Sequence, residues 1–580
     1  MRLGLGASAG AAAALVGACL SVGRPQGDFA NYWTAASLWR EGADLQRLVD
    51  YRWLADQAAR LGLGDRLVGW PPLTPPSVLF LAPLLPLGLH RAELTWLVVQ
   101  AGLALVVAWA SARAARVPLW AGVLAVALGW PALRAHLAQG QLHLPAAALL
   151  ALGLWAWRSE RPVAMGACWA LATGLKLFSW PLLLLLAAQR RWRALGAAGL
   201  VLALGATLSV ALVGLPLHRQ WLREVLPAVA GGWLQDPWHS GMSSLAAGLR
   251  HAWLPHPGLG DPVASAHPRW AVGVPAALGL LLPLLPAAAG LARGEDTTLR
   301  QGRLLAAAAL AALVGAPVIA RYSLVLLPPV VLLVSVEALR AGRQGLALST
   351  AGAALLALAA PTVNTWPAHL PLLLGLPRFW ALLLLYLVLL PRPGRSALVP
   401  LALALLVGLR ARPPVPSGVD GAVPRDDPAF PLVASDLVQA PDGSLCFSGL
   451  TADRGGLPGH GWLGLCLAPG QVAPRRVAAD PARHTWSPAV VEGQLRWSRG
   501  PTGAERPSPV PCRGGSLEEV EVDGQQDIAW RGPEGQQVRL TTHPGHDAWP
   551  VCDEKAGVAW FLSDRGVGLR ALRLWSVALP

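Results

Sequence analysis

The stretch AMGACWALATGLKLFSWPLLLLLAA, residues 164–188, is apolar along most of its length but carries one lysine, Lys176, near its middle. A helix needs roughly 20 apolar residues to cross a bilayer, so the stretch is long enough for one span. A charged side chain at the bilayer centre costs about 3 kcal/mol. Lys176 and the FSWP that follows it therefore predict either one interrupted span or two half-helices that meet at the level of the lipid headgroups.

Apolar segments of this kind recur through the first 410 residues. The chain is 54% hydrophobic and only 14% charged, whereas soluble proteins average about 25% charged residues. The pattern predicts a polytopic α-helical membrane protein with roughly 10–12 spans, some of them short or broken. A cleaved signal peptide is the alternative for the first run. The apolar runs are residues 3–22, 94–112, 118–133, 142–157, 164–188, 194–217, 271–292, 304–320, 323–339, 345–361, 379–390 and 397–409.

The positive charge follows the connections between these runs. The net charge is +14 and comes almost wholly from arginine, since lysine occurs only at Lys176 and Lys555. Arginines in short loops are typical of the cytoplasmic side of a membrane protein, where they also meet anionic lipid. Arg2 and the loop QRRWR, residues 189–193, are therefore predicted to be cytoplasmic. This distribution does not indicate a nucleic-acid-binding face.

Two long connections fall on the other side of the membrane under this topology. They are the first extracytoplasmic loop, residues 23–72, and a second large loop, residues 217–270. The first is predicted to contain two amphipathic helices, residues 31–40 and 45–61, that lie along the interface. The orientation of the segments between residues 73 and 188 stays open, because it depends on how the chain passes through Lys176.

The C-terminal part has a different sequence pattern. A Pro/Gly-rich linker, residues 411–425, separates the membrane domain, residues 1–410, from a domain at residues 426–580. Short alternating stretches in that domain predict β-strands. Residues 539–575 resemble one blade of the TolB-type β-propellers, and the length suits either a small β-propeller-like domain or a β-sandwich.

Cysteines also mark this domain as distinct. Four of the six cysteines lie within it and could form two disulfides in an oxidising compartment; they are Cys446, Cys466, Cys512 and Cys552. Cys19 and Cys168 lie in apolar runs and are predicted to be packing residues. No CxxC spacing occurs, so no zinc site is expected.

Two charged residues are the principal candidates for chemistry. Asp28 stands in GDFANYW, a few residues beyond the first apolar run, with Tyr32 close by. A carboxylate at this depth could take a proton from a sugar hydroxyl, or it could be a solvated loop acid. Lys176 could bind a phosphodiester, or it could extend its side chain to the interface.

Further polar groups interrupt the apolar runs. Gln139 and Gln141, in RAHLAQGQLH, could bind sugar hydroxyls, while Arg134 at the start of that stretch could bind phosphate. Asp236 and His239, in WLQDPWHSG, could also orient hydroxyls. The alternatives are a polar connection between helices and an interfacial aromatic belt.

Arg321 and Tyr322 lie between two apolar runs. Arg321 could bind a phosphate through two hydrogen bonds, or it could cap the helix pair at the interface. His136 and His143 have no acid nearby in the sequence, and no second acid adjoins Asp28, so no metal site is predicted.

Five segments in order resemble the polyprenol-phosphate-mannose-dependent mannosyltransferases of glycosyltransferase family 87, which have the GT-C fold and of which many are known only as a family of unknown function. The resemblance covers about residues 20–340. The segments are GDFANYWTAASLWREGADLQ, GWPPLTPPSVLFLAPLLPL, the stretch from QGQLH to QRRWRA, SGMSSLAAGLR and GAPVIARYSLVLLPP. The C-terminal β domain is not part of the family pattern.

The resemblance implies a hexosyltransferase that moves a hexose, mannose in these relatives, from a polyprenyl-phosphate donor to a glycolipid or glycan acceptor. It implies an inverting displacement with Asp28 as base, and Lys176 matches the lysine that follows the glycine- and alanine-rich helix of the family. We expect Lys176, assisted by Arg321 or Arg134, to stabilise the departing donor phosphate. Sugar or acceptor contacts would come from Tyr32, Gln139, Gln141, Asp236, His239 and Tyr322. No metal or cofactor is expected.

The implied setting is the plasma membrane, which is the inner membrane of a cell with two. The protein would cross it many times, with its active site and C-terminal domain extracytoplasmic. Two departures from the family pattern are visible. APVIARYS lacks the Trp and His that many relatives place after the proline, and Met242–Ser243 stands where relatives often have Asn-Gln.

Two other functions are consistent with the same sequence features. A transporter or flippase for a lipid-linked precursor would share the helices and the cationic groups but would need no base. Transporters often show internal repeats of hydropathy, and none is evident in the sequence. A non-catalytic membrane anchor for a binding domain is the second alternative, in which Asp28 and Lys176 could be replaced freely.

Overall fold

The computed structural model describes most of the helical region and most of the β region. The described residues are 2–24, 27–49, 51–63, 74–231, 244, 269–291, 297–316, 319–360, 377–391, 423–424, 433–452, 460–471, 475–478, 485–499, 509–522, 525–542, 547–563 and 573–580.

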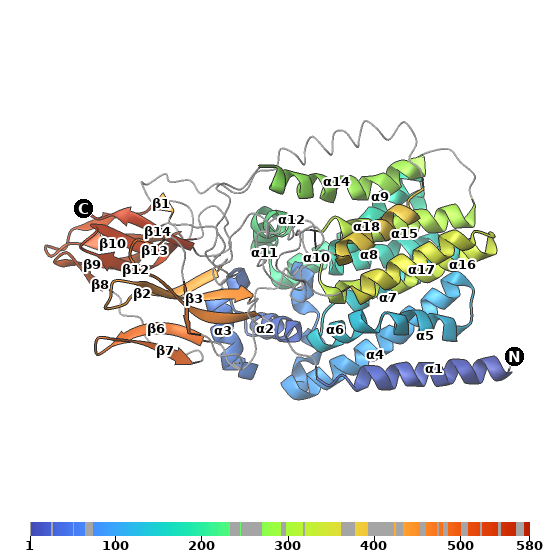
Figure 1. Ribbon diagram of the computed structural model, residues 1–580, viewed down its shortest axis with the longest axis horizontal. Coiled ribbons are helices and arrows are strands. Elements are labelled where there is room, and N and C mark those ends of the chain that lie inside the picture. Colours follow the sequence, from blue (N-terminus) through green and yellow to red (C-terminus); the bar gives the residue numbers. More distant parts are fainter. Residues whose placement is uncertain are drawn as a thin grey trace.

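The first part of the chain is helical (Figure 1). Its α-helices are α1 (Arg2–Leu20), α2 (Asp28–Arg40), α3 (Tyr51–Ala58), α4 (Gly88–Ala115), α5 (Leu119–Leu128), α6 (Trp130–Gln139), α7 (His143–Arg158), α8 (Pro162–Leu175), α9 (Trp180–Ala188), α10 (Trp192–Val213), α11 (Leu215–Gln220), α12 (Leu226–Gly231), α14 (Arg269–Leu291), α15 (Thr298–Val314), α16 (Leu327–Arg340), α17 (Gln344–Ala359) and α18 (Pro377–Leu389). Short 3-10 or π turns connect them at η1 (Leu45–Val49), η2 (Ala59–Leu63), η3 (Pro75–Leu79), η4 (Ala82–Leu87), η5 (Leu177–Ser179), η6 (Trp221–Val225) and η7 (Arg321–Leu326).

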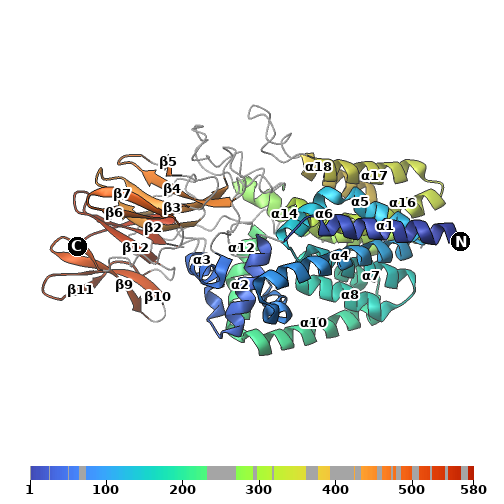
Figure 2. The same cartoon turned by 90° about the horizontal axis from the view of Figure 1, so that it is seen from below.

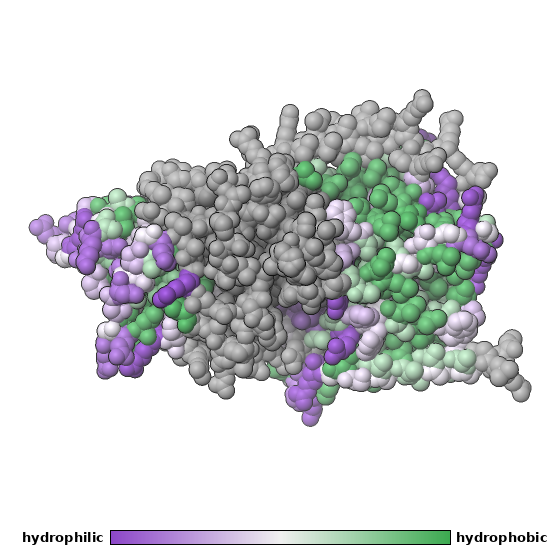
Figure 3. Space-filling model, in the orientation of Figure 1, coloured by the Kyte–Doolittle hydropathy of each residue, from purple (hydrophilic) through white to green (hydrophobic). Residues whose placement is uncertain are grey.

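The helical membrane region predicted from composition is confirmed in its main feature. Three described segments are long and apolar enough to cross a membrane: Pro75–Ala115, Trp192–Val213 and Arg321–Arg340. A fourth span arises if α5 and α6, which meet at an angle of 74°, are taken together. Six shorter apolar helices lie beside them. On the face seen in Figure 3, hydrophobic side chains cover much of this helical part, as expected for a surface in contact with lipid.

The chain reverses direction at Lys176. Gly166, near the start of α8, lies so close to the carbonyl of Ala194, near the start of α10, that a Cβ on Gly166 would collide with it. The start of α8 and the end of α9 are therefore at the same end of the bundle. At the opposite end, Thr74 Oγ1 donates a hydrogen bond to the carbonyl of Gly174 at 2.9 Å. The structure thus has two short antiparallel helices, and Lys176 lies at the turn between them.

The expectation of amphipathic helices along the interface is wrong for the first of the two. Helix α2 begins at Asp28 rather than Asn31, and all ten residues from Phe29 to Leu38 are buried. The polar residues Asn31, Thr34 and Ser37 of this helix are buried as well. The reason is packing, since η3, η4 and α3 lie against α2 and Trp39 Nε1 donates to the carbonyl of Leu212 at 2.7 Å.

The bundle therefore has two chemically different ends. Asp28, Thr74 and Lys176 lie at one end, which we call the Asp28 end. Arginines gather at the other, where α4, α7 and α16 finish and α8, α10 and α15 begin. The β-sheets lie beyond the Asp28 end, and α1 extends to the far end (Figures 1 and 2).

In the second part of the chain, the described residues form four separate antiparallel sheets. Their orders are β2-β3-β4-β5, β6-β7, β8-β9-β10-β11 and β12-β13-β14-β1. The strands are β1 (Val423–Pro424), β2 (Val433–Gln439), β3 (Leu445–Ala452), β4 (His460–Leu467), β5 (Arg475–Ala478), β6 (Thr485–Val491), β7 (Gln494–Arg499), β8 (Val510–Cys512), β9 (Gly515–Val522), β10 (Gln525–Arg531), β11 (Gln537–Arg539), β12 (Asp547–Asp553), β13 (Val558–Ser563) and β14 (Arg573–Ala578). The predicted β character is confirmed, and the described strands do not close into a single barrel.

Two observations define how this region is held together. Strand β1 lies within the predicted linker and pairs with β14, so the last sheet contains the first and last strands of the region. The structure joins Cys446 to Cys466 across β3 and β4, and Cys512 to Cys552 between β8 and β12. Since small β domains bury limited apolar area, such crosslinks add stability that packing alone does not supply.

Candidate active site

The site begins at the first residue of α2. Gly27, the residue before the helix, has φ 65° and ψ −107°, a conformation that residues with a side chain rarely adopt. A Cβ at Gly27 would also overlap the side chain of Gln139. The missing side chain lets the turn before Gln141 approach the start of α2, which brings the Asp28 carboxylate against that turn.

Both oxygens of Asp28 accept hydrogen bonds. Asn31 Nδ2, one turn along α2, donates to Oδ1 at 3.1 Å, and Gln141 Nε2 donates to Oδ2 at 2.5 Å. These amides fix the direction of the carboxylate. Burial raises the pKa of Asp28 above its usual range, while the hydrogen bond from Gln141, the charge of Lys176 and the hydrogen bond from Asn31 lower it in part. A carboxylate with a raised pKa is a stronger base than one in water.

Gln141 connects two residues of α2. Its Nε2 donates to Asp28, as above, and its Oε1 accepts from the Tyr32 hydroxyl at 2.9 Å. The backbone N–H of Leu142 also donates to Oε1, at 3.3 Å. Since the carbonyl oxygen of the amide accepts from these donors, the nitrogen must face Asp28, and the orientation of the amide is determined.

Hydrogen bonds from neighbouring helices fix the turn that carries Gln141. His136 Nε2 accepts from the Leu144 backbone N–H at 2.9 Å. The ring proton is therefore on Nδ1, which lies 3.0 Å from the side-chain oxygen of Gln100. Trp96 Nε1 donates to the carbonyl of Gly140 at 3.0 Å. His136 thus supports the turn, because both of its ring nitrogens are already used.

Lys176 approaches the carboxylate from the turn between α8 and α9. Helix α8 ends at Leu175, and Lys176 has extended backbone angles of φ −148° and ψ 126°, so its side chain leaves the line of the helix. It lies close enough to Asp28 for the two charges to stabilise each other. Both side chains are only partly buried, whereas Tyr32 and Gln141 are buried.

Aromatic side chains pack around His143 on another side of the Asp28 carboxylate. The His143 ring lies 5.3 Å from the ring of Phe178 and 5.1 Å from that of Tyr322. His143 Nε2 is 3.3 Å from the Ser323 hydroxyl. Tyr322 lies near enough to Asp28 to interact with its charge. His143 Nδ1 is buried without a hydrogen-bond partner among the described residues, so it is free to bind a polar group.

These residues form what we call the Asp28 cluster, which contains Asp28, Tyr32, Gln141, His143, Lys176 and Tyr322. Sequence reasoning named five of its six members as site residues and considered His143 only as a metal ligand. Asn31 and Ser323 were missed. Asn31 could have been found from its spacing, because residues three apart share one face of a helix.

The other predicted site residues that the structure describes lie outside the Asp28 cluster. Gln139 is exposed and packs against Gly27. Arg134 is exposed on α6, and no described contact joins it to the Asp28 cluster. Arg321 donates to the carbonyl of Ala360 at 3.4 Å and lies near a second arginine, Arg378, which sequence reasoning missed.

Two predictions fall outside the described residues, namely Asp236 and His239. No group of three or more His, Cys, Asp or Glu side chains suited to a metal occurs in the described parts of the chain.

Residues 73–317 match the model of glycosyltransferase family 87. This similarity indicates a membrane glycosyltransferase. The matched range contains Gln141, His143 and Lys176, whereas Asp28 lies well before it and Tyr322 shortly after it. Comparisons with curated proteins and with solved structures gave no match.

The left-handed backbone at Gly27 generates a first prediction. Gly27→Ala should destabilise the protein by about 1–3 kcal/mol, because it strains the backbone and drives Gln139 away from α2. Thermal unfolding of the purified protein in detergent measures the effect. Gly102→Ala in α4 is the matched control, since nothing lies within 4 Å of a Cβ there. Equal unfolding temperatures for both variants would contradict the close approach of α2 and the Gln139 turn.

Proposed function

We propose that the protein transfers a hexose, mannose by the family resemblance, from a polyprenyl-phosphate sugar to an extracytoplasmic acceptor. The observation that carries the proposal is that Asp28, held by Gln141, and the turn that carries Lys176 belong to one cluster at one end of the bundle, where Phe178 of that turn packs against His143. The base takes the proton of the acceptor hydroxyl that attacks the anomeric carbon, and the cation contacts the phosphate that leaves the same carbon. Their proximity is therefore the arrangement that such a transfer needs.

Asp28 would act as the general base. The acceptor hydroxyl gives its proton to the carboxylate as its oxygen attacks the anomeric carbon, and the bond from that carbon to the phosphate oxygen breaks. The attack comes from the face opposite the leaving phosphate, so the configuration inverts. Support comes from the two amides that fix the carboxylate and from the burial that raises its pKa.

Lys176 would stabilise the departing lipid phosphate. As the glycosidic bond breaks, negative charge grows on the phosphate, and a fixed cation at that position lowers the barrier. Arg321, next to Tyr322, is the better candidate for a second cation, because Arg134 is exposed and apart from the cluster. With these cations, no metal is required for the step.

Tyr32, Gln139 and Tyr322 remain candidates for sugar or acceptor contacts, as do Asp236 and His239. Gln141 is better assigned to holding the base, since its amide already serves Asp28 and Tyr32. His143 joins the candidates, because one of its ring nitrogens is unused in the described structure. Together these groups would select the sugar and orient its hydroxyls.

We propose the plasma membrane as the location, with the Asp28 end facing away from the cytoplasm. The arginines at the other end support this orientation, because such residues concentrate on the cytoplasmic side. The disulfides of the β region support it as well, since they form in oxidising compartments. The membrane domain would be residues 1–410 with a GT-C fold and roughly 10–12 spans, the linker residues 411–425 and the β domain residues 426–580.

The base assignment is tested by Asp28→Asn. The variant should lose transfer by about 10²–10⁴-fold, the usual contribution of a general base, while it inserts and folds normally. Purified protein is assayed with a synthetic polyprenyl-phosphate mannose and extracted glycolipid acceptors. Asp44→Asn, an exposed acid in the following turn, should keep wild-type activity. Normal activity of Asp28→Asn would support a transporter or an anchor instead.

The phosphate role is tested by Lys176→Gln. Loss of this cation should reduce kcat by about 10²–10³-fold, the range found when one charge-stabilising donor is removed, and raise KM for the donor. Lys176→Arg should recover part of the rate because it restores the charge. Steady-state kinetics at varied donor concentration separates the two effects. Full activity of Lys176→Gln would remove the lysine from the mechanism.

The hydrogen bond from Gln141 is tested by a pH profile. Because this bond lowers the pKa of Asp28, Gln141→Ala should raise that pKa further. A base must be deprotonated to act, so the acid limb of kcat/KM should move to higher pH. Gln139→Ala, on the same turn but without a bond to Asp28, should leave the limb in place. An unmoved limb in Gln141→Ala would show that another group controls it.

A further inference from the structure

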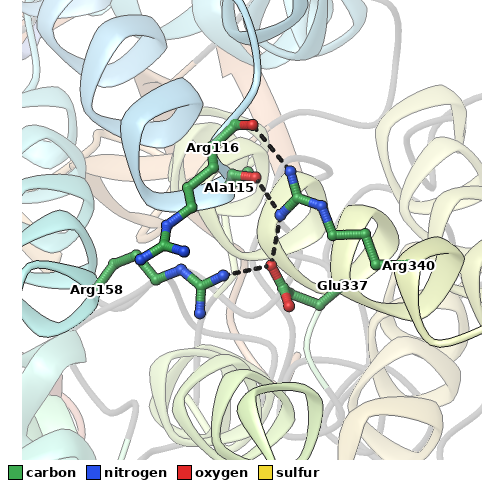
Figure 4. Close-up of polar contacts among 5 residues, drawn as sticks. All are labelled: Ala115, Arg116, Arg158, Glu337 and Arg340. Atoms are coloured by element: carbon green, nitrogen blue, oxygen red, sulfur yellow. Dashed lines mark hydrogen bonds and ion pairs between the residues drawn. The ribbon is translucent and has the colours of Figure 1, made fainter.

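A second charged cluster lies at the end of the bundle opposite Asp28. Helices α4, α7 and α16 all finish there, and their last turns bring together Arg116, Arg158, Glu337 and Arg340 (Figure 4). We call these four residues the arginine cluster. None of them belongs to the proposed transfer reaction.

Part of the cluster has a structural role. Glu337 Oε1 accepts from Arg340 at 2.7 Å and from Arg158 at 3.1 Å. The two terminal nitrogens of Arg340 also donate to the backbone carbonyls of Ala115 and Arg116, at 2.8 and 2.9 Å. Arg340 therefore caps the end of α4, and Glu337 ties α16 to α7.

The cluster nevertheless has more positive than negative charge. Three guanidinium groups face one carboxylate, and the side chain of Arg116 lies beside that of Arg158 (Figure 4). Among the described residues, no hydrogen bond or ion pair engages the guanidinium of Arg116. Arg158 Nε is buried and has no hydrogen-bond partner in the described structure. Since an unpaired buried donor is unfavourable, this arrangement is suited to an added anion.

The surroundings indicate where that anion comes from. The side chains lie where apolar helices end, and Trp109 and Trp155 pack edge to face nearby, with ring centroids 4.8 Å apart. Arg113 and Arg161 lie over these two rings, at 6.0 and 5.7 Å. Tryptophan with arginine at a helix end is typical of the headgroup level of a membrane.

We propose that Arg116 and Arg158 bind the phosphate of an anionic phospholipid in the leaflet at this end. Two adjacent guanidinium groups can each present a pair of N–H donors to phosphate oxygens. The excess charge favours an anionic headgroup such as phosphatidylglycerol, because the choline of a zwitterionic lipid would be repelled by Arg340. The bound lipid would offset the repulsion between the two arginines and hold α4 and α7 together.

The test measures lipid binding by the full-length protein in detergent. Phosphatidylglycerol or phosphatidylcholine is titrated in mixed micelles, and native mass spectrometry and thermal unfolding report the bound lipid. We expect wild-type protein to prefer phosphatidylglycerol and Arg116→Gln to lose about tenfold in its affinity. Arg193→Gln is the matched control, because it removes an exposed arginine at the same end; it should change the affinity less than twofold.

Arg116→Gln is the decisive variant, since its guanidinium takes part in none of the hydrogen bonds that hold the cluster. Arg158→Gln should show the same loss, together with a lower unfolding temperature because it also breaks the pair with Glu337. Equal losses in Arg116→Gln and Arg193→Gln would overturn the proposal in favour of general surface charge. Inorganic phosphate that stabilises the protein as well as phosphatidylglycerol does would overturn it in favour of a free anion.

Discussion

The hydrogen bond from Gln141 to Asp28 is the contact on which the arrangement of the site depends. It joins the start of α2 to the turn between α6 and α7, which lies 113 residues later in the chain. Without it, one oxygen of the carboxylate would lose its donor, and burial would raise the pKa of Asp28 still further. Gly27 makes the approach possible, His136 and Trp96 hold the turn, and Tyr32 occupies the other side of the amide. The site is thus supported by neighbours that need not touch a substrate.

The two ends of the bundle differ in their balance of charge. At the Asp28 end, opposite charges are partly buried together, and two hydrogen bonds fix the direction of the carboxylate. At the other end, arginines cap helix carbonyls and outnumber the acids. The first arrangement is suited to chemistry on a bound molecule, and the second to contact with an anionic surface.

The sequence predicted several parts of this structure because their signals are local. Apolar run length predicted the helices, and alternating stretches predicted the strands. Lys176 indicated a break in the helix. Whether the chain continues across the membrane or turns back at that point depends on packing against α10, which cannot be predicted from the local sequence. Gln139 and Gln141 are equivalent in sequence, and only the turn at Gly140, with φ 69°, makes one exposed and the other buried. The burial of α2 was missed because residues 31–40 were interpreted as an amphipathic helix along the interface, although small residues such as Ala35 and Ala36 allow close packing.

The pairing of β1 with β14 connects the point where the chain enters the β region with its last residues. During synthesis, the strands of the three other sheets leave the ribosome before β14 exists. The sheet that contains β1 can be completed only after β14 has left the ribosome, so a variant that lacks β14 would have β1 unpaired and an open sheet edge.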